Sequence, residues 1–237
     1  MILYGRNPVR EALRGRRAGT VREILATAGA AREPWLAKLP VRVTSAEEIE
    51  RRCGSPAHQG ICAQAGGYPY ADAEQLLAGR APLVVALDQI QDPQNLGSIC
   101  RTAECAGASG VVIPERRAAE ITPAVCKAAA GAVEHLPVAR VRNLADFLLL
   151  AREAGCWSYG ASAPAEGVAS VPYDRPDYDG GVVLVLGSEG RGLRPRVATV
   201  CDQLVSLPLR GRVESLGVSA AAAALLYEIL HDRERGP

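Results

Sequence analysis

Residues 83–103 read LVVALDQIQDPQNLGSICRTA and carry the pattern from which the fold is predicted. The first five residues are apolar without alternation, which is typical of a strand buried on both faces. The strand ends in a polar turn where a helix begins, and in open α/β sheets this edge faces a ligand crevice. Asn95 could cap the helix, with Arg101 within the next two turns. Taken alone, the block could equally be a helix cap followed by a surface arginine.

Apolar runs of the same kind recur toward the C-terminus. They occupy residues 110–113, 135–141, 157–161, 182–186 and 204–207, with helical segments between them. Such runs favour a parallel sheet covered by helices, so we expect an α/β domain over residues 83–237. Its last helix, Val218–Arg233, is so rich in small and apolar residues that we expect it in the core or against another subunit.

The N-terminal part of the chain predicts a smaller α/β domain over residues 1–66. One expected helix, 8–14, starts behind Asn7, and a second starts behind the capping pair Ser45 and Glu48. The expected strands lie at residues 21–26, 41–44 and 60–65. Gly, Pro, Tyr and small polar residues dominate the stretch that follows, so residues 67–82 are predicted to form a linker.

Composition describes a folded protein with one unusually basic segment. The 237 residues are 48% hydrophobic and carry a formal net charge of +1, yet residues 1–22 hold six arginines against the single acid Glu11. Seven cysteines without a Cys-x-x-Cys pair suggest neither a disulfide framework nor a zinc site, and they fit a reducing cytoplasm. No apolar stretch approaches the length of a bilayer span, so we expect no membrane anchor.

Two further blocks lie later in the chain. Leu186–Leu193, LGSEGRGL, follows an apolar run with three glycines, which let backbone amides approach a ligand closely. Its G-x-x-G-x-G spacing differs from the dinucleotide fingerprint, so a nucleotide-dependent oxidoreductase is a weak alternative. Leu207–Ser219, LPLRGRVESLGVS, joins a strand end, a basic loop and a helix start at which Ser215 is a natural N-cap.

In their order and spacing, these three blocks closely resemble the signature motifs of the SpoU (TrmH) family of RNA ribose methyltransferases. The resemblance extends from about Leu83 to the C-terminus, and residues 57–61, AHQGI, are similar to the end of the RNA-binding N-terminal domain of many members. It implies a SPOUT domain, a parallel α/β fold with a C-terminal trefoil knot, that works as a homodimer and uses S-adenosylmethionine. A sulfonium methyl group is already activated, so this chemistry requires no metal.

The resemblance also implies roles for individual residues. Carried onto this chain, the catalytic residues are Asn95, Arg101, Glu189 and Ser215. The cofactor-binding residues are Gly160, Ala161, Leu186, Gly187, Gly192, Leu207, Leu209, Ser215 and Leu216. The RNA-binding residues of the N-terminal domain are Arg6, Arg10, Arg14, Arg16, Arg17, His58 and Gln59. A merely solvated basic face remains an open alternative for this last set.

Two of these roles depend on ordinary side-chain chemistry. A guanidinium with a pKa above about 12 is a poor base, so Arg101 is expected to position the acceptor and stabilise charge. Glu189 is expected to anchor its loop or a partner subunit's arginine rather than to act as a base.

The third block departs from the family pattern Ser-Leu-Asn-Val-Ser, because Gly217 stands in place of the asparagine. Asn and Gly both adopt positive φ readily, so we expect a left-handed backbone to be kept at this position. The exchange then removes one side-chain hydrogen bond, and Gly217→Asn is expected to tighten cofactor binding modestly.

The sequence therefore predicts an S-adenosylmethionine-dependent RNA 2′-O-ribose methyltransferase that acts on a guanosine of large-subunit (23S) ribosomal RNA. A transfer-RNA guanosine is the alternative substrate. A non-catalytic RNA-binding relative is the alternative class, motivated by Gly217.

Overall fold

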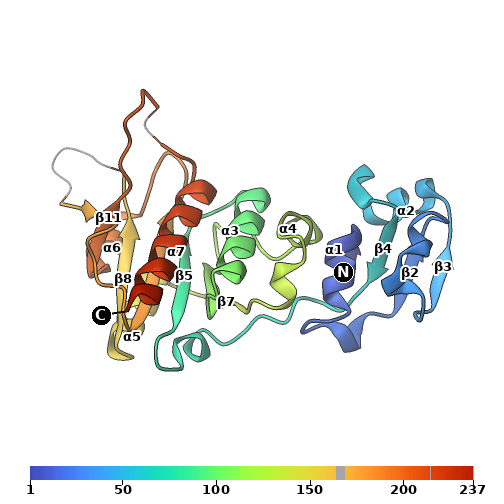
Figure 1. Ribbon diagram of the computed structural model, residues 1–237, viewed down its shortest axis with the longest axis horizontal. Coiled ribbons are helices and arrows are strands. Elements are labelled where there is room, and N and C mark those ends of the chain that lie inside the picture. Colours follow the sequence, from blue (N-terminus) through green and yellow to red (C-terminus); the bar gives the residue numbers. More distant parts are fainter. Residues whose placement is uncertain (164–168, 214, 237) are drawn as a thin grey trace. The chain divides into compact units, whose positions relative to one another are not determined.

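The computed structural model describes residues 1–163, 169–213 and 215–236. Its contacts divide the chain into two compact units, whose elements are labelled in Figure 1. Unit 1 comprises Met1–Pro69 and Glu120–His135, and unit 2 comprises Tyr70–Ala119 and Leu136–Pro237. Residues 120–135 thus belong to the N-terminal unit, although in the chain they connect two strands of the C-terminal one.

Unit 1 is built on a sheet with the strand order β1-β4-β2-β3. The strands are β1 (Ile2–Tyr4), β2 (Glu23–Ala26), β3 (Val41–Val43) and β4 (Ile61–Gln64). The helices are α1 (Arg6–Ala12), α2 (Ala46–Cys53) and α4 (Pro123–Ala128), with 3-10 helices η1 (Ala18–Thr20), η2 (Ala30–Arg32), η3 (Pro34–Leu36), η4 (Pro56–His58) and η6 (Ala132–Glu134). Ile49 of α2 packs against Leu25 and Cys62 of the sheet and closes a small core.

The start of α1 differs from the sequence prediction. The helix begins at Arg6 behind Gly5, whose φ is 94°, so Asn7 lies inside the helix and does not cap it. The Arg6 N–H instead donates to Gln59 Oε1 at 3.0 Å, a contact that spans 53 residues of chain. The predicted cap of α2 is confirmed, because Ser45 Oγ accepts a hydrogen bond from the backbone N–H three residues later at 3.3 Å.

A buried ion pair joins the two chain segments of unit 1. The side chains of Arg17 and Glu134 are 1% and 0% exposed. Arg17 Nε donates to Glu134 Oε2 at 2.9 Å, and Arg17 Nη2 contacts Glu134 Oε1. Arg17 also donates to the Gly66 carbonyl at 3.3 Å and lies 5.6 Å from the centre of the Tyr68 ring. The prediction that Arg17 contacts RNA is therefore wrong, because its charge is enclosed and neutralised within the unit.

Unit 2 holds a sheet with the strand order β7-β6-β5-β10-β8-β11-β9, in which neighbouring strands pair in parallel. The strands are β5 (Leu83–Asp88), β6 (Gly110–Pro114), β7 (Val138–Val141), β8 (Cys156–Ala161), β9 (Val171–Pro172), β10 (Gly181–Gly187) and β11 (Gln203–Ser206). The helices are η5 (Glu74–Leu77), α3 (Pro93–Cys105), α5 (Leu144–Glu153), α6 (Pro195–Val200) and α7 (Val218–Arg235). The predicted α/β class and parallel sheet are confirmed.

Helices cover both faces of this sheet (Figure 1). On one face, Val84 and Val183 form a core with α5 and with Val197 of α6. On the other face, α3 and α7 pack against each other and bury Leu96 and Leu226 completely. Because successive side chains of a strand point to opposite faces, strands covered on both sides must be apolar along their whole length.

The centre of the sheet brings the first two sequence blocks together. β5 pairs with β10 along its length, and Asp88 stands opposite Gly187 where both strands end. The chain leaves β5 toward β6 on one side, whereas it leaves β10 toward β11 on the other. Diverging connections of this kind open a crevice at the carboxyl ends of the strands, which is where open α/β sheets bind ligands.

Some strand boundaries differ from the sequence prediction. The run at residues 135–141 becomes a strand only at Val138, because Ala132–Glu134 forms η6 and Pro137 has no N–H to donate to a neighbouring strand. The sequence also does not predict β1 and β9, which have three and two residues. Strands this short carry no periodicity of their own and depend on their neighbours in the sheet.

The buried pair of unit 1 makes a stability prediction. We expect Arg17→Met to lower the free energy of unfolding by about 3–5 kcal/mol, because it leaves the Glu134 carboxylate buried without its partner. The double variant R17M/E134L should recover most of this loss, since apolar side chains then replace both charges. Urea denaturation followed by circular dichroism measures both variants. A single variant as stable as the unmodified chain would contradict the buried ion pair.

Candidate functional site

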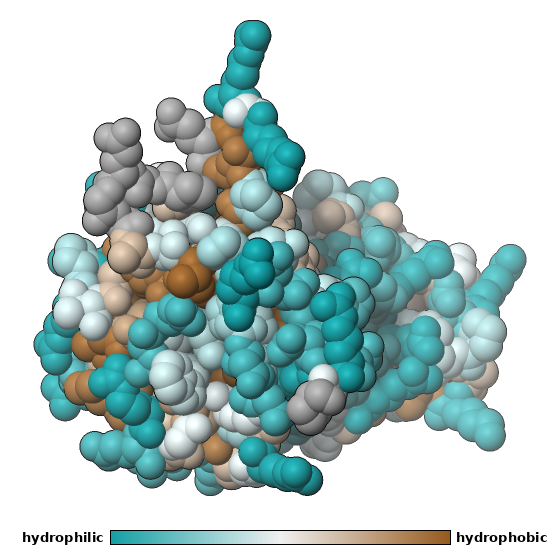
Figure 2. Space-filling model, turned by 60° about the vertical axis from the view of Figure 1, so that its left-hand side comes forward, coloured by the Kyte–Doolittle hydropathy of each residue, from teal (hydrophilic) through white to brown (hydrophobic). Residues whose placement is uncertain are grey.

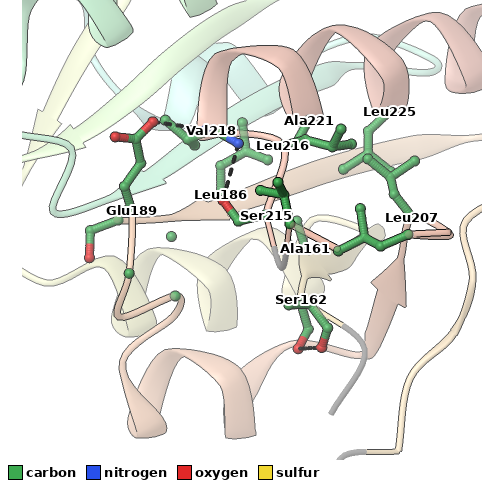
Figure 3. Close-up of a pocket in the computed structure, with 18 of the residues that line it drawn as sticks. Ala161, Ser162, Leu186, Glu189, Leu207, Ser215, Leu216, Val218, Ala221 and Leu225 are labelled. Atoms are coloured by element: carbon green, nitrogen blue, oxygen red, sulfur yellow. Dashed lines mark hydrogen bonds between the residues drawn. The ribbon is translucent and has the colours of Figure 1, made fainter. Parts of the chain in front are cut away.

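A cavity of about 780 Å³ lies at the carboxyl edge of the unit 2 sheet (Figure 3). Its lining comes from neighbouring strands and from the start of the last helix. Ala161 ends β8, Leu186 lies in β10 and Leu207 follows β11. Leu216 and Ala221 come from the loop before α7 and from α7 itself. The second and third sequence blocks therefore enclose a space in the size range of small-molecule sites.

Apolar side chains are exposed beside this cavity. Val213 and Leu216 line it and are 75% and 51% exposed. They belong to residues 207–213 and 215–217 between β11 and α7, a part of the chain that projects in Figure 1 and has a hydrophilic tip in Figure 2. Exposed apolar side chains next to a cavity favour a ligand with an apolar or aromatic surface.

A second cavity of about 310 Å³ adjoins the first and has a polar lining. Its polar side chains are Gln89, Gln91, Asp92, Asn95, Ser188, Glu189 and Arg191. The two cavities share Ser188, Glu189 and Val218 in their linings. Two ligands bound in these cavities would therefore meet beside Glu189.

Glu189 connects the second sequence block to the start of α7 (Figure 3). Its Oε1 accepts a hydrogen bond from the Val218 N–H at 3.2 Å. Gly217 occupies the N-cap position and has no side chain, so the Glu189 carboxylate replaces the cap and its charge suits the positive end of the helix. Ser215 is not the N-cap that the sequence predicts, because its Oγ accepts from the Gly217 N–H at 3.2 Å instead.

A buried carboxylate holds the glycine loop that follows β10. Asp88, which is 1% exposed, accepts hydrogen bonds from the Arg194 backbone N–H at 2.8 Å and from Arg194 Nε at 2.7 Å. Within the loop, Ser188 and Gly192 exchange backbone hydrogen bonds of 2.9 and 3.1 Å. A Cβ at Gly187 would lie 2.2 Å from the Gly192 carbonyl carbon, so the turn itself requires glycine at position 187.

The structure brings together most of the residues predicted to bind the cofactor. Those that line the first cavity are Ala161, Leu186, Gly187, Gly192, Leu207, Leu209, Ser215 and Leu216. Gly160 is outside this lining, because a Cβ there would meet the side chains of Leu204 and Leu193. Gly160 therefore lies in the packed layer, whereas its neighbour Ala161 lines the cavity.

The four predicted catalytic residues do not share one cavity. Glu189 and Ser215 line the first cavity, and Glu189 and Asn95 line the second. Asn95 does not cap α3, because the Asp92 carboxylate accepts the N–H groups of Gln94 and Asn95 at 3.1 and 3.3 Å. Arg101 is exposed on α3 and belongs to neither lining.

The predicted RNA contacts of unit 1 differ in accessibility. Arg6, Arg14, Arg16 and Gln59 are exposed, and Arg10 is half-buried. Arg6 also pairs with Glu33 at 2.8 Å. The prediction for His58 is wrong, because the ring is 7% exposed and its Nδ1 accepts a hydrogen bond from the Gly60 N–H at 2.9 Å. The role of His58 is to hold the turn that leads into β4.

Sequence reasoning missed Asp88, Gln89 and Arg191. Gln89 follows β5 directly, lines the second cavity and has a φ of 62°, which is uncommon for a residue other than glycine. Each of the three lies where a central strand ends, and this position is a usable sign of a ligand crevice. Val218 and Leu225 could not be found in this way, because their place in the lining depends on how α7 packs.

Other chemistries find little support in this part of the molecule. Burial raises the pKa of the Cys201 thiol to about 12, so it stays protonated at neutral pH and is a poor nucleophile. Within residues 1–163, 169–213 and 215–236, no group of three His, Cys, Asp or Glu side chains is placed to hold a metal ion. The helices of these same segments include none that is long and apolar enough to cross a membrane.

The parallel sheet, the glycine loop and the two adjoining cavities define an α/β protein with a ligand-binding crevice at the carboxyl edge of its sheet. A model of the SpoU rRNA Methylase family matches residues 82–227, and a model for RNA 2′-O ribose methyltransferase substrate binding matches residues 2–71. The chain belongs to the SpoU (TrmH) family of S-adenosylmethionine-dependent RNA methyltransferases. The resemblance carried by the three sequence blocks is confirmed, and with it the cofactor.

Individual relatives match over most of the chain. A putative TrmH family tRNA/rRNA methyltransferase of Bacillus subtilis, YacO, is 44% identical over 187 residues, which cover 76% of this chain and 72% of the relative. A putative TrmH family tRNA/rRNA methyltransferase of Staphylococcus saprophyticus is 34% identical over 250 residues, which cover 98% of this chain and 96% of the relative.

Solved structures show the same SPOUT fold. The SpoU methyltransferase AviRb from Streptomyces viridochromogenes, in complex with AdoMet, matches with a TM-score of 0.83 at 25% identity, over 100% of this chain and 91% of AviRb. An AdoMet-bound rRNA methyltransferase from Sinorhizobium meliloti matches with a TM-score of 0.80 at 26% identity, over 100% and 87%. The trefoil knot stays a prediction.

The backbone at Gly217 changes the expectation for this position. Its φ of 74° and ψ of 145° lie outside the left-handed helical region that asparagine shares with glycine. The expectation of a left-handed backbone at Gly217 therefore holds for the sign of φ but is wrong for ψ. The conformation borders a region that is essentially restricted to glycine, where another residue is strained by about 1–3 kcal/mol.

We expect Gly217→Asn to weaken cofactor binding rather than tighten it, because relieving this strain moves the Val218 N–H away from Glu189. Calorimetric titration with S-adenosylmethionine and thermal unfolding measure the two effects. Gly217→Ala is the matched control, since it imposes the same strain without an amide. Tighter binding by Gly217→Asn at an unchanged melting temperature would overturn this expectation.

Proposed function

We propose that the protein methylates the ribose 2′-oxygen of a guanosine in large-subunit (23S) ribosomal RNA. The observation that carries the proposal is the meeting of an apolar and a polar cavity at Glu189. The apolar cavity is assigned to the methyl donor and the polar one to the acceptor nucleoside. The match of residues 2–71 to a substrate-binding domain of RNA 2′-O ribose methyltransferases supports the ribose as the acceptor.

The first cavity suits S-adenosylmethionine in size and chemistry. Leu186, Leu207 and Leu216 offer apolar surfaces to the adenine, and the missing side chains of Gly187 and Gly192 leave backbone groups close to the ligand. When bound, the cofactor supplies an electrophilic sulfonium methyl group. The protein then has to hold the acceptor oxygen in line with that group and keep water out.

The second cavity suits the acceptor nucleoside. Gln89, Gln91 and Asn95 carry amides that both donate and accept hydrogen bonds, as recognition of a ribose and a base edge requires. Glu189 borders both cavities and uses Oε1 to accept from Val218. We assign its Oε2 to the 2′-hydroxyl, whose hydrogen bond to the carboxylate would orient the oxygen toward the methyl group.

Arg101 keeps a positioning role in this proposal. It lies six residues after Asn95 on α3, which is less than two helical turns from the second cavity. Its exposed guanidinium can reach the phosphate beside the acceptor nucleotide, and its planar fork suits phosphate oxygens. A guanidinium is a poor base, which argues against that role for this residue.

The choice of ribosomal RNA is supported by the rRNA methyltransferase from Sinorhizobium meliloti, which matches the whole chain. Transfer RNA is the second candidate, because the curated relatives are described as tRNA/rRNA methyltransferases.

We further propose a cytoplasmic homodimer. Tyr227 of α7 is 42% exposed and Leu216 is 51% exposed, and a second copy would cover such apolar surface. Sedimentation velocity measures this state, and a monomer at micromolar concentration would contradict it.

Methyl transfer from labelled S-adenosylmethionine to unmodified ribosomal and transfer RNAs tests the function. We expect label in ribosomal RNA and an alkali-resistant linkage at one guanosine, because ribose methylation blocks cleavage there. Glu189→Gln should lower kcat about tenfold, and Arg101→Lys should raise KM for RNA with little change in kcat.

Label in the base with every linkage still cleaved by alkali would contradict ribose methylation. Label in transfer RNA alone would identify transfer RNA, the second candidate, as the substrate. Cofactor binding without transfer to either RNA would identify a non-catalytic relative.

A further inference from the structure

Three exposed arginines lie on the loops that follow the outer strands β6 and β7. Arg116 and Arg117 follow Glu115 in the loop after β6, which ends at Pro114, and Arg142 comes directly after β7. Because all strands of this sheet run in parallel, these loops share the carboxyl edge at which both cavities open. These three arginines lie outside the three motif blocks and outside the linings of both cavities.

Hydrogen bonds join these loops to the wall of the second cavity. The Ala119 N–H donates to the carbonyl of Ile90 at 2.8 Å, and Gln91 Nε2 donates to the carbonyl of Arg117 at 3.4 Å. Ile90 and Gln91 both line the second cavity. The Glu115 N–H continues the connection to β7 by donating to the Val141 carbonyl at 2.9 Å. The arginine loops and the cavity wall therefore form one connected surface.

The backbone of this surface is held in an unusual conformation on both sides. Gln89 has a φ of 62° and Arg117 has a φ of 59°, and neither is glycine. Residues held in such sparsely populated regions cluster at ligand clamps, because the surrounding structure has to impose them. Here they flank the point at which Gln91 bridges the two loops.

Acidic side chains lie among these arginines, because Glu115 and Glu120 flank Arg116 and Arg117 in the sequence and Asp92 lines the second cavity. None of the ion pairs among the described residues involves Arg116, Arg117 or Arg142. On the other side of the cavity, Arg191 contributes a further exposed guanidinium from the glycine loop. The strand order places β7, β6, β5 and β10 side by side, so the arginines span about 14 Å of sheet edge with the second cavity between them.

We propose that this edge is the path of the acceptor RNA strand across unit 2. Arg116, Arg117 and Arg142 hold phosphates on one side of the acceptor nucleotide, and Arg191 holds a phosphate on the other. The inference rests on the proposed function, because it takes the second cavity as the place of that nucleotide. A strand laid along one sheet edge with a base in a cavity has to be unpaired there, so the RNA is single-stranded at the site.

The test uses the full chain and a labelled 20-nucleotide single-stranded RNA of random sequence, with binding followed by fluorescence anisotropy at several salt concentrations. Arg117→Ala and Arg142→Ala should each weaken binding roughly threefold, as expected for an exposed charge contact. Each should also reduce the slope of log affinity against log salt by about 0.7, since one phosphate contact is lost. A perfect RNA duplex of the same length should compete poorly.

Arg80→Ala is the matched control, because this exposed arginine precedes β5 and therefore lies at the opposite edge of the same sheet. It should keep the affinity and salt slope of the unmodified protein. Unchanged binding by both edge variants, an equal loss in Arg80→Ala, or competition by the duplex as strong as by single strands would overturn the inference.

Two further measurements separate this inference from the proposed function. Calorimetric binding of S-adenosylmethionine should be unchanged in the edge variants, which excludes a folding defect. In the methyl-transfer assay, these variants should raise KM for RNA while kcat stays the same. If the unmodified protein transfers no methyl group, the proposed function fails while the anisotropy still tests the edge. If it transfers methyl groups and the edge variants behave like Arg80→Ala, the edge inference alone fails.

Discussion

Asp88 places a negative charge at the end of β5, where almost no solvent reaches it, and Arg194 neutralises it with hydrogen bonds of 2.8 and 2.7 Å. A buried carboxylate without partners would be strongly unfavourable, so the loop after β10 has to return to this point. The polar loop after β5 and the glycine loop are thereby fixed against each other. Glu189 lies inside the second loop, so its contact with α7, and hence the boundary between both cavities, depends on this pair.

The sequence predicts those parts of the fold that local patterns determine. Unbroken apolar runs predicted the central strands, and Ser45 predicted its own cap, because burial on two faces and N-capping act within a few residues. Predictions failed where a partner comes from a distant part of the chain. At the start of α1, the first backbone N–H donates to Gln59 rather than to Asn7. At the start of α7, it donates to Glu189 rather than to Ser215. Arg17 was misassigned because nothing near it in the sequence indicates Glu134.

In the candidate site, too, some features could be predicted from the sequence, and others depend on contacts between distant parts of the chain. Leu186 and Asn95 could be predicted because the blocks that contain them resemble the motifs of a known family, and the position of these blocks after buried strands fits a ligand crevice at the edge of a parallel sheet. That the two cavities are distinct depends on the packing of α7 against β10, which places Val218 in both linings. Arg101 shows the limit of motif transfer, because its position on α3 places it beside the cavities rather than in them.

The insertion of residues 120–135 into unit 1 also affects the order in which the chain can fold during synthesis. The first 69 residues contain Arg17 but not Glu134, so this unit cannot neutralise its buried charge when its own N-terminal segment leaves the ribosome. The charge of Arg17 can be neutralised only after β5, α3, β6 and α4 have been translated, because Glu134 follows them in the chain. Nascent chains generally complete their N-terminal domain first, whereas here unit 1 is complete only after residue 135, when part of unit 2 has already been translated. The N-terminal unit is therefore not a detachable module, because a gene fragment cut after residue 69 would encode only part of it.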